Sequence, residues 1–135
     1  LMVGLQQERH LTYIFISHDL SVVEHISDTI AIMYLGRIVE KGPVEAIFEN
    51  PRHPYTRALI EAVPIPDPTQ RREVVPLEGE TPSSVSPPSG CTFHTRCPFV
   101  IDECRAMVPV LEGVGETNGL PAPEHLAACI RQHEI

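Results

Sequence analysis

The stretch TYIFISHDLSVVEHISDTIAIMYLGRIVEKG (residues 12–42) carries the clearest secondary-structure signals in this 135-residue chain. It opens with the apolar, β-branched and aromatic run Thr12–Ser17, which predicts a buried strand. Asp19 follows, in a position to cap a helix. The expected inward-facing residues of that helix are Leu20, Val22, Val23 and Ile26.

The second half of the same stretch predicts a hairpin followed by two helices. Thr29–Tyr34 and Arg37–Lys41 are expected strands, joined by a tight turn at Leu35-Gly36 where glycine permits a positive φ. Pro43 is suited to opening a short helix, because proline is tolerated in a first turn. Its inward residues would be Val44, Ile47 and Phe48, and a further helix is expected over Tyr55–Ala62.

Working outward, Leu1, Met2 and Leu5 among polar residues predict the last turns of a surface helix. Residues 1–62 therefore resemble the closing portion of an α/β domain. One strand and a hairpin are too few to close a sheet, so an apolar face would stay uncovered. Because the chain opens at Leu1 within an amphipathic pattern, we expect a fragment.

The composition changes after residue 62. Seven of the 14 prolines fall between Pro64 and Pro88, which predicts an extended linker over residues 63–90. Residues 91–135 form a small module with few aliphatic residues, which would need a cross-link such as a bound metal to be stable. All the cysteines lie in this module, at Cys91, Cys97, Cys104 and Cys129.

Charge and hydropathy exclude several classes of protein. The net charge of -8 and the pI near 5.3 argue against nucleic-acid binding, because phosphate backbones need a basic surface. The sequence contains no apolar run of membrane-spanning length and no N-terminal signal pattern. With 42% hydrophobic residues, a packed core is expected.

Ser17-His18-Asp19 stands where the predicted strand gives way to a helix. Ligands of open α/β sheets bind at the carboxyl ends of strands. There His18 could donate a hydrogen bond to a phosphate oxygen or hold a water for attack. A lone histidine at such a place is more often a surface or capping residue.

The order of features in residues 12–42 resembles the H-loop region of ABC-transporter ATP-binding domains. The match consists of Ser17-His18-Asp19, Ser27-Asp28, Met33, Gly36 and Lys41-Gly42. The resemblance implies that His18 is the switch histidine, which contacts the γ-phosphate of ATP and positions the attacking water. Such a role fits a reaction that depends on orientation and charge stabilisation.

Two parts of that family's ATP site do not occur in this sequence. There is no G-x-x-x-x-G-K-[ST] loop to cradle phosphates, and no apolar strand ending in Asp-Glu to hold Mg²⁺. The resemblance places both before Leu1, in the end of a P-loop NTPase domain that this chain would supply. ATP with Mg²⁺ is thus expected of the intact protein, and no ATPase activity of this chain alone.

Three later stretches resemble the ATPase subunits of oligopeptide and dipeptide importers. They are ENPRHPYTRALIEAVP (residues 49–64), PSGCTFHTRCP (residues 88–98) and the late pair His125 and Cys129; the likeness departs at Thr95 and around residues 113–123. It implies membrane-spanning permease subunits, a second identical or sister ATP-binding subunit, and indirectly an extracytoplasmic peptide-binding protein. It also implies a peripheral place on the cytoplasmic face of a bacterial membrane. Dipeptides, oligopeptides and nickel chelates stay open as cargo.

The four cysteines predict metal ligation more readily than disulfides in a chain without a secretory signal. Their spacing lacks the two- to four-residue pairs of structural zinc sites, and four wider-spaced thiolates suit an iron–sulfur cluster. The resemblance likewise implies a [4Fe-4S] cluster on Cys91, Cys97, Cys104 and Cys129, with zinc or free thiols as alternatives. His94 and His125 could substitute as ligands, but we expect them to hydrogen-bond to sulfur or to nearby backbone. Arg96 either offsets thiolate charge or is solvated.

Two rival functions remain from the sequence. One is a stand-alone iron–sulfur or zinc interaction module without nucleotide chemistry, which would leave the predicted strand and hairpin without a purpose. The other is an electron-transfer protein, which the absence of a flavin or haem signature disfavours.

Overall fold

The hairpin predicted within residues 29–41 is the centre of the fold. In the computed structural model, which describes residues 2–63, 77, 79–117, 120–121 and 124–135, strands β1 (Thr29–Tyr34) and β2 (Arg37–Pro43) pair antiparallel. Leu35 and Gly36 both have positive φ, 46° and 77°, as a tight two-residue hairpin turn requires. The hairpin prediction is confirmed, and β2 runs two residues further than expected.

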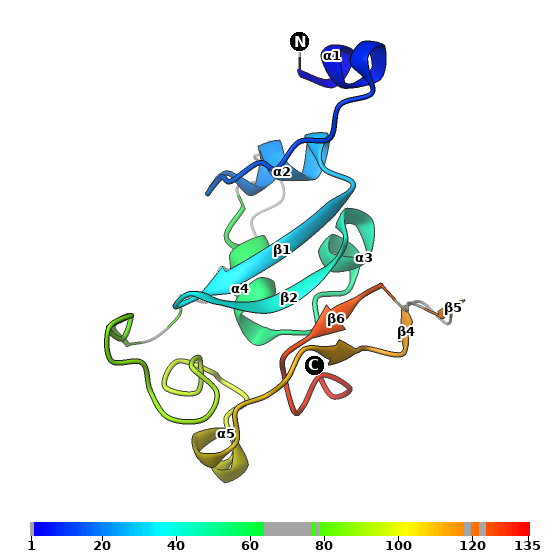
Figure 1. The fold of residues 1–135 in the computed structure, drawn as a ribbon. Coiled ribbons are helices and arrows are strands. Elements are labelled where there is room, and N and C mark those ends of the chain that lie inside the picture. The colour runs from blue at the N-terminus through cyan, green and yellow to red at the C-terminus, as the bar shows by residue number, and fades with distance from the viewer. Residues whose placement is uncertain (1, 64–76, 78, 118–119, 122–123) are drawn as a thin grey trace, which may run out of the picture.

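The sheet continues into the C-terminal part of the chain. Its strand order is β1-β2-β6-β3, where β6 is Leu126–Ala127 and β3 is Glu112–Gly113, and each neighbouring pair is antiparallel. A second ladder joins β4 (Glu116–Thr117) to β5 (Leu120–Pro121). The edge of β2 that faces away from β1 is therefore paired with β6, a strand from the C-terminal part of the chain (Figure 1).

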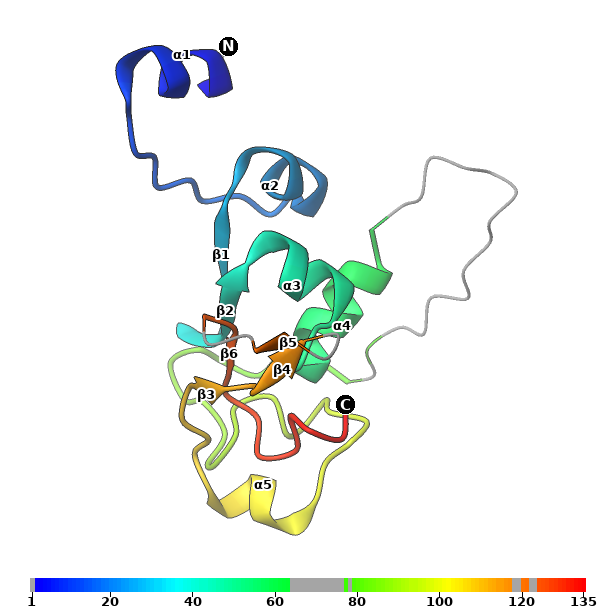
Figure 2. The same cartoon turned by 90° about the vertical axis from the view of Figure 1, so that its right-hand side faces the viewer.

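Within the part of the chain that the structure describes, five short helices accompany these strands. They are α1 (Met2–Arg9), α2 (Leu20–Ile26), α3 (Val44–Glu49), α4 (Pro54–Glu61) and α5 (Asp102–Ala106). Figures 1 and 2 place α1 at one extreme of the molecule and α5 at the other, with the hairpin, α3 and α4 between them. No helix of the described residues is both long and apolar enough to cross a membrane.

The expected helix boundaries follow local rules. The Asp19 carboxylate accepts the amides of Ser21 and Val22 at 3.1 and 3.3 Å, so it caps α2 as predicted. Helix α3 begins after Pro43. Helix α4 begins one residue earlier than expected, with Pro54 in its first turn and His53 Nδ1 accepting the amide of Tyr55 at 3.1 Å.

The core lies on one face of the hairpin and is shared by both parts of the chain. β1 alternates, with Ile30, Ile32 and Tyr34 buried. Phe93, from the cysteine-bearing part, is fully buried, with ring centroids 5.1 Å from Tyr34 and 5.4 Å from Tyr55. The parts predicted as residues 1–62 and 91–135 thus pack into one core; those boundaries remain predictions.

Most of the inward-facing residues were assigned correctly. Ile47 is fully buried, and Leu20, Val23, Val44 and Phe48 pack against the core. Val22 is an exception, because 41% of it is exposed on the outer side of the seven-residue α2.

The prediction of a buried strand at Thr12–Ser17 is wrong for this structure. The segment has no strand assignment, and Ile14 and Ile16 are 95% and 93% exposed. A strand is stabilised by hydrogen bonds to a neighbour, and no strand among the described residues pairs with it. The expected mixture of helices and strands is present, and every described pairing of strands is antiparallel.

The predicted linker is described only in part. Residues 64–76 and 78 lie outside the described residues, so the expectation for them stays a prediction. Residues 79–90 contain no helix or strand, as expected of a proline-rich segment. Arg96 Nη1 donates to Thr81 Oγ1 at 3.1 Å, which ties this stretch to the cysteine-bearing part.

Candidate functional site

His18 lies at the start of α2, in the wall of an open groove. Its side chain is exposed, and within the described chain it makes no hydrogen bond or ion pair. The local turn is held instead by its neighbours, since the amide of Asp19 donates to Ser17 Oγ at 3.0 Å. The imidazole is therefore free to meet a ligand or another polypeptide, but the carboxyl edge of a strand on which it was expected is not formed.

The groove beside His18 is large and lined mainly by apolar groups. Its volume is about 1210 Å³, and its walls come from the Thr12–Ser17 segment, α2, β1 and the end of α4. Tyr13, Ile14, Phe15 and Ile16 are all at least 40% exposed on this side of the chain. Such an extent of exposed apolar surface marks a site that contacts another macromolecule or chain segment.

The four predicted ligands, Cys91, Cys97, Cys104 and Cys129, come together at the opposite end of the molecule. All are free thiols, and all line one enclosed space between the 91–109 region and the C-terminal residues. The amide of Cys91 donates to the carbonyl of Cys104 at 2.8 Å, which brings two of them together. Gly90 allows this approach, because a Cβ there would lie 2.4 Å from the Cys104 oxygen.

Burial governs the protonation of these thiols. It raises the pKa of Cys91 and Cys97, and that of Cys129 to about 11, with smaller contributions in the same direction from neighbouring cysteines. Cys91, Cys97 and Cys129 are therefore protonated at neutral pH unless a cation binds, since coordination deprotonates a thiol. Among the described residues, no group of three or more His, Cys, Asp or Glu side chains is placed to hold a metal ion.

Of the two histidines near the cysteines, His94 bonds to nearby backbone as expected, whereas His125 bonds to a distant side chain, which was not expected. His94 Nδ1 is 2.8 Å from the carbonyl of Cys91, and His125 Nε2 is 2.7 Å from Glu40 Oε1. Arg131 was missed by the sequence reasoning. It lies near Cys97, whose pKa its charge lowers slightly against the larger effect of burial, and it donates to the Phe99 carbonyl at 3.0 Å. Its position two residues after Cys129 was the available signal.

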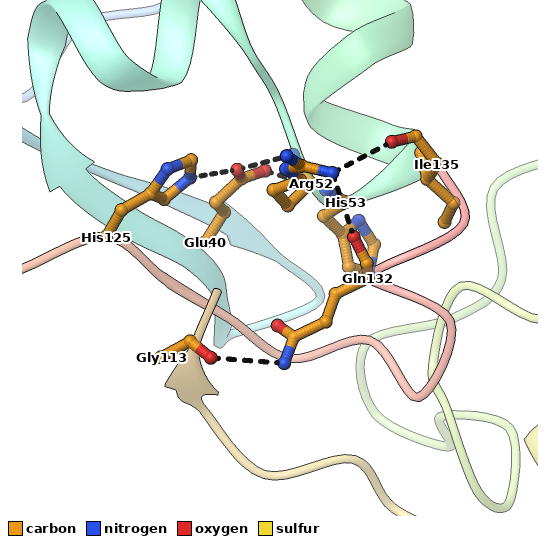
Figure 3. Close-up of polar contacts among 7 residues, drawn as sticks. All are labelled: Glu40, Arg52, His53, Gly113, His125, Gln132 and Ile135. Carbon is orange, nitrogen blue, oxygen red and sulfur yellow. Dashed lines mark hydrogen bonds and ion pairs between the residues drawn. The ribbon is translucent and has the colours of Figure 1, made fainter. Parts of the chain in front are cut away.

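A buried polar network joins the hairpin to the C-terminal part of the chain (Figure 3). Glu40 on β2 is fully buried and accepts three hydrogen bonds, from the amides of Arg52 and His53 at 2.7 and 2.9 Å and from His125 Nε2. Burial lowers the pKa of His53 to about 4, although the Glu40 charge opposes this. Nothing in the sequence marked this network, because Glu40 is a charged residue in a strand that also carries Arg37 and Lys41.

The sequence of residues 39–104 matches the family described as "Oligopeptide/dipeptide transporter, C-terminal region". These residues, just under half of the chain, are similar to that family. The oligopeptide/dipeptide transporter region runs from β2 to α5. It includes Glu40, Arg52 and three of the four cysteines, while Cys129 lies beyond it.

Curated proteins similar to this chain carry related names. A probable peptide ABC transporter ATP-binding protein of Sinorhizobium fredii is 62% identical over 111 residues, which are 82% of this chain and 31% of that protein. The dipeptide transport ATP-binding protein DppF of Haemophilus influenzae is 55% identical over 112 residues, 83% of this chain and 34% of that protein. A putative peptide import ATP-binding protein of Brucella ovis is 50% identical over 133 residues, 98% of this chain and 40% of that protein.

This chain thus spans between about a third and two fifths of the relatives it matches. Because the Brucella match covers 98% of the chain, it extends well beyond the oligopeptide/dipeptide transporter region.

Proposed function

We propose that this chain is the C-terminal part of the ATP-hydrolysing subunit of a peptide-importing ABC transporter. The names of its relatives support this, and so does the share of their length that it spans. In such a protein the phosphate-binding loop and the Mg²⁺-holding carboxylates come from residues that this chain does not contain. The stand-alone metal module is not favoured, because all three relatives are named ATP-binding proteins of peptide transport.

The observation that carries the proposal is the open groove beside β1. Ile14 and Ile16 are almost wholly exposed there, and the outer edge of β1 has no described strand beside it. An exposed apolar segment next to an open sheet edge is costly in water and invites added strands. We infer that the preceding strands of the ATP-binding domain pack here, with Thr12–Ser17 as one strand among them.

His18 would then act as the switch histidine of that domain. Asp19 fixes the start of α2, so the imidazole is held at the mouth of the groove. An exposed imidazole with no hydrogen bond in the described chain is free to donate to a terminal phosphate oxygen or to orient a water. The assembled subunit would pair with a second ATP-binding subunit and dock on permease subunits at the cytoplasmic face of the membrane, receiving cargo by way of an extracytoplasmic binding protein.

A chimera tests this function. The N-terminal portion of the Haemophilus DppF would be joined to this chain, and Mg²⁺-dependent ATP hydrolysis would be measured for the chimera and its H18A variant. We expect hydrolysis by the chimera and a loss of about 100-fold in H18A, in line with the removal of one positioned donor.

The matched control is H25A. His25 is also exposed and lies in the last turn of α2, the helix that begins two residues after His18, so its loss should leave hydrolysis unchanged. An H18A chimera as active as its H25A counterpart would remove His18 from the chemistry. A soluble chimera that binds no ATP would count against the assignment to the ATP-binding domain.

We also propose that the four cysteines hold a [4Fe-4S] cluster. The donor set fits, because four free thiols line one space whose walls are mainly apolar. The sequence spacing of the four cysteines is wider than the short pairs of structural zinc sites, and this favours a cluster over a single zinc. The cluster would cross-link the C-terminal segment to the 91–104 loop, a structural contribution.

Anaerobic incubation of the chain with ferrous iron and sulfide tests the cluster. We expect about four iron ions per chain and a broad absorbance near 400 nm. The C104S variant, which alters the most deeply buried of the four thiols, should lose both. Stoichiometric zinc with no uptake of iron would instead favour the zinc site.

A further inference from the structure

Three of the four cysteines share one local scaffold, and the fourth does not. Cys91, Cys97 and Cys104 lie in a loop closed by its own hydrogen bonds, including Cys91 amide to Cys104 carbonyl at 2.8 Å and Val100 amide to Cys97 carbonyl at 3.3 Å. Cys129 lies outside this loop, two residues after the end of β6. Its place relative to the other three must therefore be set by contacts outside that loop.

The segment before Cys129 is fastened to the hairpin. The amide of Ala128 donates to the Val39 carbonyl at 2.8 Å, and β6 pairs with β2. Four residues before Cys129, the fully buried His125 donates from Nε2 to Glu40 Oε1. Gly42 makes room for this crossing, because a Cβ there would lie 3.1 Å from the Cα of His125.

The segment after Cys129 is fastened to the same region. The amide of Gln132 donates to the Cys129 carbonyl at 3.2 Å. Arg52 Nη1 in turn donates to the carbonyls of Gln132 and Ile135 at 3.4 and 3.3 Å (Figure 3). The segments on both sides of Cys129 are thus connected to Glu40. The preceding segment bonds to Glu40 through His125, and the following one bonds to Arg52, whose amide donates to Glu40.

Glu40 is suited to this place by its chemistry. A carboxylate has acceptors only, and this one receives three donors: the Arg52 amide, the His53 amide and His125 Nε2. A glutamine of the same size would turn an NH₂ group toward one of those donors. Leaving a buried charged or polar group without its partner is unfavourable, so the hydrogen bond between Glu40 and His125 resists breaking.

We propose that Glu40 is a positioning residue of the four-cysteine site, which acts through His125 and β6 to hold Cys129 toward Cys91, Cys97 and Cys104. The inference rests on the proposed cluster for its chemical purpose. The placement of the thiol itself can be measured without a metal.

The first test measures how much iron each variant binds and which type of cluster it forms. Wild-type chain, E40Q, H125L and C129S would be loaded anaerobically with ferrous iron and sulfide, then examined for iron content and by EPR after mild oxidation. We expect about four iron ions in the wild type. The E40Q and H125L variants should instead give the EPR signal of a three-iron cluster, and C129S should give the same signal. The H125Q variant keeps a donor for Glu40 and should return to the wild-type pattern.

The second test follows the thiol in the metal-free chain. Alkylation of each cysteine by iodoacetamide would be timed by mass spectrometry. We expect Cys129 to react at least about 10-fold faster in E40Q and H125L, with Cys91 changed less than about twofold. A milder variant, R52M, leaves Glu40 and its backbone donors in place and should speed Cys129 by about threefold.

The control for general destabilisation is I47A. Ile47 is fully buried in the core and does not line the four-cysteine space, so its truncation should weaken the core without releasing Cys129. This variant should keep four irons and wild-type labelling of Cys129. A three-iron signal in I47A would overturn the proposal, because loss of stability would then account for the effect.

The two ideas fail separately. If the wild type takes up no iron or zinc, the cluster is refuted while the labelling rates still decide the placement of Cys129. If iron content, EPR and labelling in E40Q, H125L and R52M all equal the wild type, the positioning role is refuted with the cluster intact.

Discussion

The two ends of this molecule present their candidate residues in opposite ways. His18 lies on an open, apolar groove and has no bonded partner in the described chain, whereas the four cysteines are enclosed by loops that hydrogen-bond to one another and to the hairpin. The difference indicates that the cysteine site is assembled from within the chain. Under the proposed function, the histidine site is one component of a larger site that other residues of the subunit complete.

The largest contrast should come from truncating one phenylalanine at each end. Phe93 is fully buried between Tyr34 and Tyr55, so Phe93→Ala should lower the free energy of unfolding by about 4 kcal/mol. Phe15, 42% exposed on the groove side, should change it by less than about 0.5 kcal/mol. Urea unfolding followed by circular dichroism measures both, and equal losses would contradict the contrast.

A second pair of variants compares two glycines with positive φ. At Gly90, φ is 67° and a Cβ would lie 2.4 Å from the Cys104 oxygen, so Gly90→Ala should cost about 3 kcal/mol in the free energy of unfolding. At Gly79, φ is 80° but the nearest atom is 3.9 Å away, and the same change should cost about 1 kcal/mol. If both variants lose the same stability, close approach of the chain to Cys104 is not what Gly90 provides.

Acidification should weaken the cysteine end through His53. Its pKa falls from 6.5 in the unfolded chain to about 4 in the fold, so the unfolded state binds the proton first. Stability is then complete above pH 6.5 and declines as the pH falls toward 4, by up to about 3 kcal/mol.

The H53N variant isolates this contribution. Asparagine can still accept the Tyr55 amide as an N-cap but does not titrate. The difference in unfolding free energy between wild type and H53N should therefore shrink between pH 7 and pH 4. A difference that stays constant over this range would show that His53 does not take up the proton.

The smallest effect is expected at the open end. Asp19→Ala removes the acceptor for the Ser21 and Val22 amides and should cost about 1 kcal/mol, while Asp19→Asn keeps an acceptor and should cost a few tenths. Hydrogen exchange of those two amides reports the local change. Equal exchange in both variants would contradict capping by Asp19.

The success of the sequence analysis differed between the two ends for a physical reason. The hairpin, the α2 cap and helices α3 and α4 were predictable because each depends on neighbours within a few residues, such as Leu35-Gly36 or Pro43. The convergence of the four cysteines was expected from the family resemblance. The strand at Thr12–Ser17 failed because a strand needs a partner, and composition alone does not supply one.

The Glu40–His125 pair was out of reach of sequence reasoning. Its members are 85 positions apart, and β6 is only two residues long, so no periodicity marks either the strand or its register. Glu40 also breaks the rule that a charged strand residue faces solvent. Only the tertiary structure shows that its carboxylate meets three donors.

The pairing of β6 with β2, together with the insertion of Phe93 beside Tyr34, has a consequence for truncated or cleaved forms of the protein. Shortening the chain at the proline-rich stretch would uncover a row of backbone donors and acceptors on β2 and an aromatic cavity, both of which promote aggregation. A protease that cut the same stretch without removing the tail would leave two fragments still bound to each other, separable only in denaturant.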